Sequence, residues 1–117
     1  MKLEVGQFTR LKSGYICKII NVNDFREPNM KYGVEANYLK DIMFIGDDDI
    51  VKASYNIIDL IEKNDYINGS WVNKIVDGKP IHEDYNDPFY SFGWENDDIK
   101  TVITHEQMEQ MAYRVEE

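Results

Sequence analysis

A chain of 117 residues is long enough for one ordinary domain or two very small ones. Hydrophobic residues make up 43% of it and aromatic residues 13%, which is enough for a packed core and excludes a disordered chain. No apolar run approaches the roughly 18 residues of a membrane span, and the N-terminus carries no signal-peptide core. The single cysteine, Cys17, excludes an internal disulfide and predicts a buried thiol in a reducing cytoplasm.

The net charge of −9 is unevenly distributed along the chain. Residues 1–58 hold 8 basic and 8 acidic side chains, whereas residues 59–117 hold 5 basic and 14 acidic ones. A soluble surface does not require this asymmetry, so it is the strongest functional signal in the sequence. The excess of acid argues against direct binding to nucleic acid, whose phosphates it would repel.

The predicted elements of the first half are mostly strands separated by turn formers. In chain order we expect strands over 4–12 and 15–22, a loop over 23–30, strands over 30–36 and 38–45, an acidic turn over 46–49, a strand over 50–54 and a helical turn over 54–60. In the second half we expect strands over 60–67 and 71–76, a turn over 77–80, mixed loop and strand over 82–98, a strand over 99–103, a short helix from Thr104 to about Met111 and a last strand over 112–115. Thr104 and Gln107 fit a capping box for that helix. Short strands with a turn every 8–12 residues or so predict an all-β fold with one or two short helices.

Two parts of the sequence repeat one pattern. Residues 3–10 match residues 61–68 at an offset of 58, and residues 15–20 match 71–76 at an offset of 56. Asn68-Gly69 lies between the two matches of the second copy and predicts a hairpin with a type I′ turn. The triplet Asp48-Asp49-Ile50 returns as Asp97-Asp98-Ile99. These matches predict a duplicated unit, either as two small β domains, a first over 1–54 and a second, acidic one over 55–117, or as one compact duplicated β domain.

The predicted order of strand, hairpin, further strands and a one-turn helix before the last strand resembles SH3-like small barrels. The chain also resembles a set of small uncharacterised proteins of Gram-positive bacteria and their prophages. The stretches that carry this second resemblance are residues 5–8, 56–62, 65–69 and 99–107. The resemblance covers most of the chain and implies a phage or mobile-element origin, which places the protein in the cytoplasm of a bacterial host. It brings no activity with it.

Motifs of catalysis and of metal or cofactor binding are missing from the sequence. There is no Gly-rich phosphate loop and no Gly-x-Ser-x-Gly, so we expect neither an enzyme nor a cofactor. Residues 47–49 are three consecutive aspartates without the alternate spacing of an EF-hand, which predicts a solvated turn. His82 and His105 are the only histidines, too few for a zinc site of the usual kind, so no metal is expected. His105 is assigned to the first turn of the capped helix.

Residues 82–98 are the strongest candidate for a functional surface. They contain six acids and five aromatic residues but no lysine or arginine. Carboxylates between aromatic rings suit docking on a basic groove, because charge steers the encounter and rings anchor it. We expect Phe89 and Phe92 to pack in the core. The alternative for the acids is that they are exposed to solvent and bind no partner. The predicted partner-binding residues are Glu83, Asp84, Tyr85, Asp87, Tyr90, Trp94, Glu95, Asp97 and Asp98.

Three functions follow from these features. The leading hypothesis is a phage-type inhibitor that binds the basic surface of a host nucleic-acid-binding defence protein and mimics nucleic-acid charge, as some anti-CRISPR proteins do. The second is a structural or adaptor module without an inhibitory role. The third is weak RNA or DNA binding through a basic patch on the first unit, made of Arg10, Lys12, Lys18 and Arg26. The identity of the partner and the oligomeric state stay open.

Overall fold

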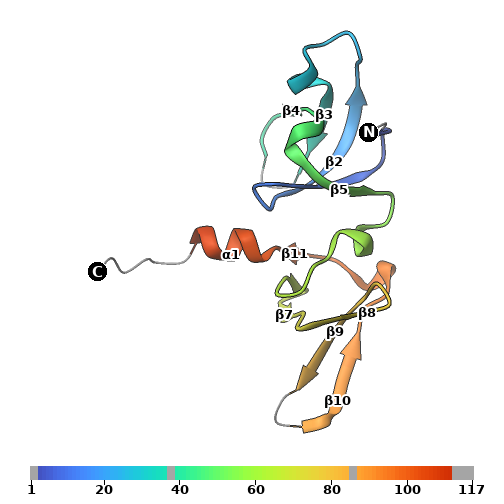
Figure 1. The fold of residues 1–117 in the computed structure, drawn as a ribbon, viewed down its shortest axis with the longest axis vertical. Helices are drawn as coiled ribbons and strands as arrows, with labels where there is room; N and C mark the ends of the chain where they lie inside the picture. Colours follow the sequence, from blue (N-terminus) through green and yellow to red (C-terminus); the bar gives the residue numbers. More distant parts are fainter. Residues whose placement is uncertain (1–2, 37–38, 85–86, 112–117) are drawn as a thin grey trace, which may run out of the picture. The chain divides into compact units, whose positions relative to one another are not determined.

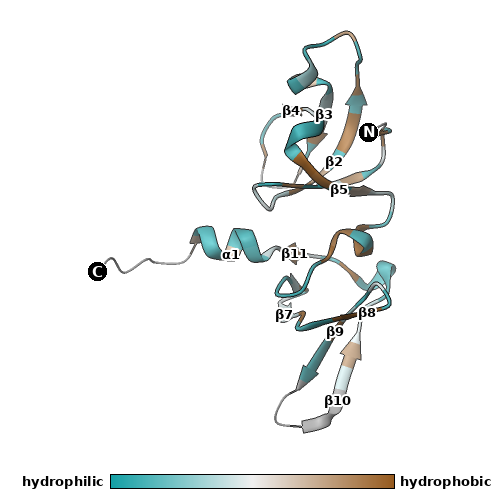
Figure 2. Cartoon of the chain, viewed as in Figure 1, coloured by the Kyte–Doolittle hydropathy of each residue, from teal (hydrophilic) through white to brown (hydrophobic). Residues whose placement is uncertain are grey.

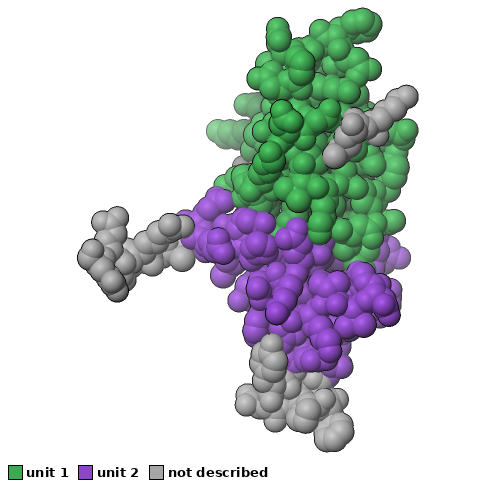
Figure 3. All heavy atoms as spheres, viewed as in Figure 1, with its two compact units in different colours: residues 1–60 green, residues 61–117 purple. Residues whose placement is uncertain are grey.

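The computed structural model describes residues 3–36, 39–84 and 87–111, with the side chains of residues 84 and 87–90 outside that description. The chain divides into two compact units, residues 1–60 (unit 1) and 61–117 (unit 2), as Figure 3 shows. This division falls six residues after the predicted one. The 3₁₀-helix η3 (Ile57–Leu60) remains with unit 1, where Nη1 of Arg10 donates a hydrogen bond of 3.0 Å to the carbonyl oxygen of Leu60.

Unit 1 contains one five-stranded antiparallel sheet (Figure 1). Its elements are β1 (Phe8–Leu11), β2 (Ile16–Val22), η1 (Pro28–Met30), β3 (Tyr32–Glu35), β4 (Met43–Ile45), η2 (Asp47–Asp49), β5 (Ile50–Ser54) and η3. The sheet order is β4-β3-β2-β1-β5, so the last strand returns to pair with the first. Each predicted strand is present: β5 has the predicted bounds, and the other four are shorter than predicted. The prediction for residues 37 and 38 lies outside the described residues.

The core of unit 1 collects apolar side chains from every strand of this sheet. Figure 2 shows hydrophobic stretches along β2 and β5. Cys17 is 2% exposed, which confirms the predicted buried thiol. Across the β1–β2 pair, the hydroxyl of Thr9 donates to the carbonyl oxygen of Cys17 at 3.2 Å and thereby satisfies a buried polar group. The buried core residues are Leu3, Leu11, Cys17, Ile19, Tyr32, Val34, Ile45 and Ile50.

Unit 2 contains two three-stranded antiparallel sheets, of order β11-β6-β7 and β10-β9-β8. Its elements are β6 (Tyr66–Ile67), β7 (Ser70–Trp71), β8 (Lys74–Val76), β9 (Lys79–Asp84), β10 (Asp87–Gly93), η4 (Asn96–Asp98), β11 (Val102–Ile103) and α1 (His105–Met111). The predicted single strand over 71–76 is therefore wrong in part, because it is two strands in different sheets. The break falls at Asn73, whose side-chain Nδ2 donates to the carbonyl oxygen of Glu83 at 2.7 Å while its Oδ1 accepts from the Glu83 amide at 2.8 Å.

Two tight turns fix the hairpins of unit 2. Asn68 and Gly69 have φ of 51° and 84°, so both central residues of the β6–β7 turn are left-handed, as predicted for type I′. Asp77 and Gly78, with φ of 51° and 77°, repeat that geometry between β8 and β9. The predicted turn over 77–80 is thus too long, since β9 begins at Lys79. A third hairpin, β9–β10, occupies much of the stretch predicted as mixed loop and strand.

The helix α1 follows β11 and has the predicted cap. The amide of Thr104 donates to Oε1 of Gln107 at 2.9 Å, and the Gln107 amide donates to Oγ1 of Thr104 at 3.3 Å. This reciprocal capping box starts the helix at His105. The ribbon of α1 is coloured mostly as hydrophilic residues in Figure 2, and none of the helices described is long and apolar enough to cross a membrane. The strand predicted over 112–115 lies outside the described residues. The described chain is mostly β.

Candidate functional site

The predicted acidic surface is built from β9, β10 and the 3₁₀-helix η4. Glu83 lies on β9, Glu95 is the N-cap of η4, and Asp97 and Asp98 lie within it. Glu95, Asp97 and Asp98 are exposed, and Glu83 is half-buried. The predicted Tyr85 lies outside the described residues, and so do the side chains of Asp84, Asp87 and Tyr90.

Two of these acids have cationic partners from neighbouring strands. Nζ of Lys74 lies 3.1 Å from Oε1 of Glu83, and Nζ of Lys79 lies 2.6 Å from Oε1 of Glu95. Exposed ion pairs of this kind stabilise a fold by only about 0–1 kcal/mol. They nevertheless cancel part of the negative potential that would steer a basic partner, so the surface is less acidic than its composition indicates.

The remaining two acids differ in their local roles. Oδ2 of Asp98 accepts a hydrogen bond of 3.0 Å from the Glu95 amide and so closes the turn that starts η4. Asp97 occupies the middle of η4 and is exposed; only its backbone oxygen takes part in the bond of 3.1 Å from Nζ of Lys100. Asp97 is therefore the acid of η4 that a partner can engage without loss of the local fold.

Trp94 does not belong to the surface on which it was predicted. Its side chain is 6% exposed and packs in the core of unit 2 with Ile61, Ile67 and Val72. The ring of Phe92 meets that of Trp94 edge-on, with centroids 4.9 Å apart, which confirms the prediction that Phe92 packs inward. A buried indole cannot contact a partner, so the prediction that Trp94 is a partner-binding residue is wrong.

The basic patch expected on unit 1 does not include Arg10, because this residue is buried. Arg10 is only 1% exposed because its side chain reaches inward to the Leu60 carbonyl. Lys12 and Lys18 are exposed, and Nζ of Lys18 lies 5.8 Å from the centroid of the Phe8 ring. Without Arg10 the expected stripe of cations is broken, which weakens the case for nucleic-acid binding through this unit.

Unit 1 instead exposes apolar and aromatic side chains that the sequence did not indicate. Phe25 is 99% exposed, and Ile42 and Phe44 are also exposed. The guanidinium carbon of Arg26 lies 4.7 Å from the centroid of the Phe44 ring, which is within the range of a cation–π contact. Gly33 leaves room for this arrangement, because a Cβ there would lie 3.3 Å from Ile42 and 3.4 Å from Phe44.

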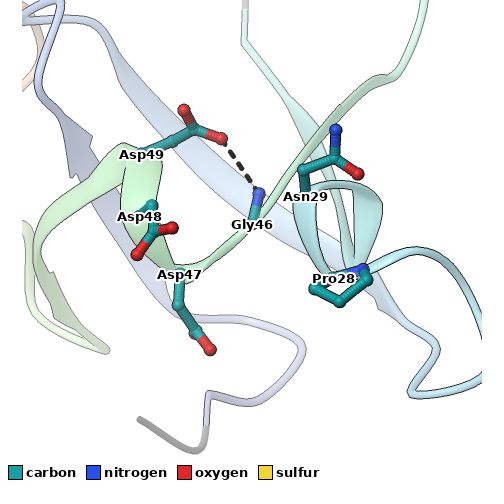
Figure 4. Close-up of a pocket in the computed structure, with 6 residues that line it drawn as sticks. All are labelled: Pro28, Asn29, Gly46, Asp47, Asp48 and Asp49. Atoms are coloured by element: carbon teal, nitrogen blue, oxygen red, sulfur yellow. Dashed lines mark hydrogen bonds between the residues drawn. The ribbon is translucent and has the colours of Figure 1, made fainter.

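The acidic turn η2 borders a hollow whose other lining residues are Pro28, Asn29 and Gly46 (Figure 4). Oδ2 of Asp49 accepts a hydrogen bond of 3.0 Å from the Gly46 amide, and Oδ1 of Asp47 accepts one of 2.7 Å from the hydroxyl of Tyr32. The carboxylates of residues 47–49 point in different directions in Figure 4, so they do not converge on a common ligand. Burial, together with the hydrogen bond to Asp47, raises the pKa of Tyr32.

The sequence reading missed a cluster of three titratable side chains in unit 2. Nε2 of His105, at the start of α1, lies 3.2 Å from Oε1 of Glu62 and 3.3 Å from Oε1 of Glu106. All three side chains are partly buried. Adjacent His105-Glu106 is visible in the sequence, but Glu62 lies 43 residues away from the histidine and is brought near it by the pairing of β6 with β11.

Comparison of the chain with protein-family models, with curated proteins and with solved structures finds no match.

Proposed function

We propose that the protein is a non-catalytic binding module that docks through the acidic surface of unit 2 on a basic surface of a host protein. The observation that carries the proposal is the charge difference between the units. Residues 61–117 hold 5 basic and 13 acidic side chains, a net charge of −8, whereas residues 1–60 have a net charge of −1. A field of one sign on one unit steers a partner of opposite charge and raises its rate of association.

The form that this binding takes is inhibition by mimicry of nucleic acid. A host protein that binds phosphates offers a groove lined by lysine and arginine, and carboxylates on a rigid scaffold suit such a groove. The hairpin β9–β10 and the capped turn η4 supply this scaffold, because backbone ladders and the Asp98 cap hold Asp97 and Glu95 in place. The phage or mobile-element origin implied by the sequence resemblance agrees with an inhibitor of a host defence protein.

We further propose that the two units are copies of one SH3-like design. Support comes from equivalent hydrogen bonds. The Glu4 amide donates to Oε1 of Gln7 at 2.7 Å before β1, and the Glu62 amide donates to Oδ2 of Asp65 at 2.8 Å before β6. A 3₁₀-helix closed by an aspartate precedes the last strand of each unit: η2 precedes β5 and η4 precedes β11. Oδ2 of Asp49 accepts from the Gly46 amide at 3.0 Å, and Oδ2 of Asp98 accepts from the Glu95 amide at 3.0 Å.

The strand pairs of the two units correspond as well, with one correction. Phe8 pairs with Lys18, and Tyr66, at the predicted offset of 58, pairs with Trp71. In the proposed duplication Trp71 is then the counterpart of Lys18 at an offset of 53, which differs by three residues from the predicted offset of 56. Unit 2 has a shorter turn than its sequence match indicates, because Asn68-Gly69 closes the hairpin with two residues.

A second candidate function rests on unit 1. The exposed side chains of Phe25, Ile42 and Phe44 suit an adaptor that binds a partner by apolar contacts, with Arg26 adding a cation beside the rings. Binding through this surface would respond little to salt, whereas binding through unit 2 would weaken as salt screens the acids.

Capture of partners from a bacterial lysate by three immobilised proteins tests the choice between the units. The first is the wild type. The second neutralises four acids of unit 2 by Glu83→Gln, Asp84→Asn, Asp87→Asn and Asp97→Asn, and the third neutralises four exposed acids of unit 1 by Glu27→Gln, Glu35→Gln, Asp41→Asn and Asp48→Asn. Asp97 and Asp48 are equivalent mid-turn positions, and the capping residues Asp98 and Asp49 stay unchanged.

We expect the unit 2 variant to lose a partner that the wild type and the unit 1 variant both retain. DNA or heparin added to the lysate should displace the same partner, because a nucleic-acid mimic and a polyanion compete for one basic groove. Loss of the partner from the unit 1 variant alone would contradict the proposal. Retention by both variants, with loss on Phe25→Ser, would favour the adaptor instead.

A further inference from the structure

We propose that Glu62, His105 and Glu106 form a binding site for a divalent transition-metal ion, with zinc as its best fit. The three ligand atoms, one imidazole nitrogen and two carboxylate oxygens, all lie within 4.8 Å of one another. Imidazole and carboxylate are both zinc ligands in proteins, and two carboxylates with a neutral imidazole balance the charge of a dication. This site is separate from the acidic surface formed by β9, β10 and η4.

The spacing of the ligand atoms fits a tetrahedral shell. With metal–ligand bonds of about 2.0–2.1 Å, neighbouring ligands in a tetrahedron lie roughly 3.3 Å apart. Nε2 of His105 lies 3.2 Å from Oε1 of Glu62 and 3.3 Å from Oε1 of Glu106, so two of the three edges already have this length. The third edge can close by rotation of the two glutamate side chains. The fourth position is left for water or for a group of a partner.

A buried carboxylate holds the ligand-bearing segments together. Asp65 is fully buried; its Oδ2 accepts from the Glu62 amide at 2.8 Å and its Oδ1 accepts from the His105 amide at 2.9 Å. One side chain thus ties together two stretches that lie 43 residues apart in sequence. A ligand set fixed by the backbone in this way loses less conformational entropy on binding a metal than one on flexible loops.

In the proposed duplication Glu4 of unit 1 is the counterpart of Glu62, and among the described residues no histidine–glutamate cluster of this kind surrounds it. Glu4, which has the same backbone bond as Glu62, accepts a hydrogen bond from the hydroxyl of Tyr55. In unit 1 the partner of Glu4 is the hydroxyl of Tyr55, whereas in unit 2 a histidine and a second glutamate lie beside Glu62.

The experiment is calorimetric titration of the tag-free, metal-stripped chain with ZnCl2, near neutral pH and with MgCl2 as a parallel titrant. We expect one zinc per chain, no comparable response to magnesium, and affinity at least about tenfold weaker in Glu62→Gln, Glu106→Gln and His105→Gln. His82→Gln is the matched control, since it removes the other histidine, whose Nδ1 contacts the Trp71 carbonyl oxygen at 2.8 Å. That variant should bind zinc as the wild type does.

Proton–nitrogen correlation spectra of the wild-type imidazoles keep the test decisive where a variant fails to fold. Zinc should shift the ring signals of His105 and leave those of His82 in place. Absence of zinc binding to the wild type, a shift confined to His82, equal affinity in the three ligand variants, or an equal response to magnesium would each overturn the proposal. In the first case the cluster is a histidine hydrogen-bonded to two carboxylates and nothing more.

Discussion

Asn68 fastens the β6–β7 turn to the segment between η4 and β11, and its removal should destabilise unit 2. Oδ1 of its side chain accepts hydrogen bonds from the amides of Lys100 at 2.9 Å and Thr101 at 3.0 Å. Its Nδ2 donates to the carbonyl oxygen of Asp98 at 2.8 Å. Asn68 also adopts a φ of 51°, which asparagine tolerates better than alanine does. The substitution Asn68→Ala removes all of these contributions at once.

The expected loss can be worked out from these contacts. Each hydrogen bond contributes about 0.5–1.5 kcal/mol, and the low end applies here because the residues are exposed and water replaces the lost partners. Three such bonds give about 1.5 kcal/mol, and a left-handed alanine costs about 1 kcal/mol more. Asn68→Ala should therefore lower the free energy of unfolding by about 2.5 kcal/mol, whereas Asp77→Ala, in a turn of the same geometry without bonds to residues 98–101, should lower it by about 1 kcal/mol.

Urea denaturation followed by tryptophan fluorescence measures this loss in unit 2 alone, because Trp71 and Trp94 are the only tryptophans and both lie in that unit. The midpoint should fall further for Asn68→Ala than for Asp77→Ala, with unchanged slopes. Equal losses in the two variants would refute the reasoning, since they would show that the side-chain bonds of Asn68 contribute nothing beyond the backbone conformation.

Three further predictions concern single residues. Gly69→Val should destabilise unit 2 by about 1–2 kcal/mol through backbone strain alone, because φ is 84° and, apart from the adjoining residues, no atom of the described residues lies within 4 Å of an added Cβ; a wild-type fluorescence midpoint would disprove this. Gly46→Ala should destabilise unit 1 by about 1–3 kcal/mol, because its Cβ would lie 2.7 Å from the Cα of Asn29; unchanged thermal melting by circular dichroism would contradict that clash. The raised pKa of Tyr32 means that its contribution to stability is complete below about pH 10 and is lost as the pH rises through the folded-state value. Tyr32→Phe should therefore flatten the alkaline fall in the stability of unit 1, measured by urea denaturation from about pH 9 to pH 12, and an unchanged fall would show that Tyr32 does not titrate in this range.

Structural features that depend only on residues adjacent in sequence could be predicted from the sequence. Asn68-Gly69 specified its turn because two successive left-handed residues admit few sequences, and Thr104 with Gln107 specified the start of α1 because the capping box is complete within four residues. The β character of the chain also followed from alternation and turn spacing. Each of these features needs no knowledge of distant contacts.

Structural features that depend on contacts between residues far apart in the sequence could not be predicted in this way. The strand expected over 71–76 is broken because Asn73 bonds with Glu83 across the sheet, and Arg10 is buried because its guanidinium reaches Leu60 fifty residues later. Trp94 was assigned to a surface because its neighbours are acidic, although its ring fills the core of unit 2. The cluster at His105 likewise depends on the register of β6 against β11.

The central claim is that the acids of unit 2 steer the protein onto a basic partner. The most direct measurement is the association rate constant of the captured partner with the wild type and with the two neutralised variants, at low and at high salt. We expect the wild type and the unit 1 variant to associate fast at low salt. Their association should slow at higher salt, because the Debye length falls to about 8 Å near physiological ionic strength. The unit 2 variant should associate slowly at both salt concentrations, with a smaller salt effect. An association rate that is the same for all three proteins and indifferent to salt would contradict the account.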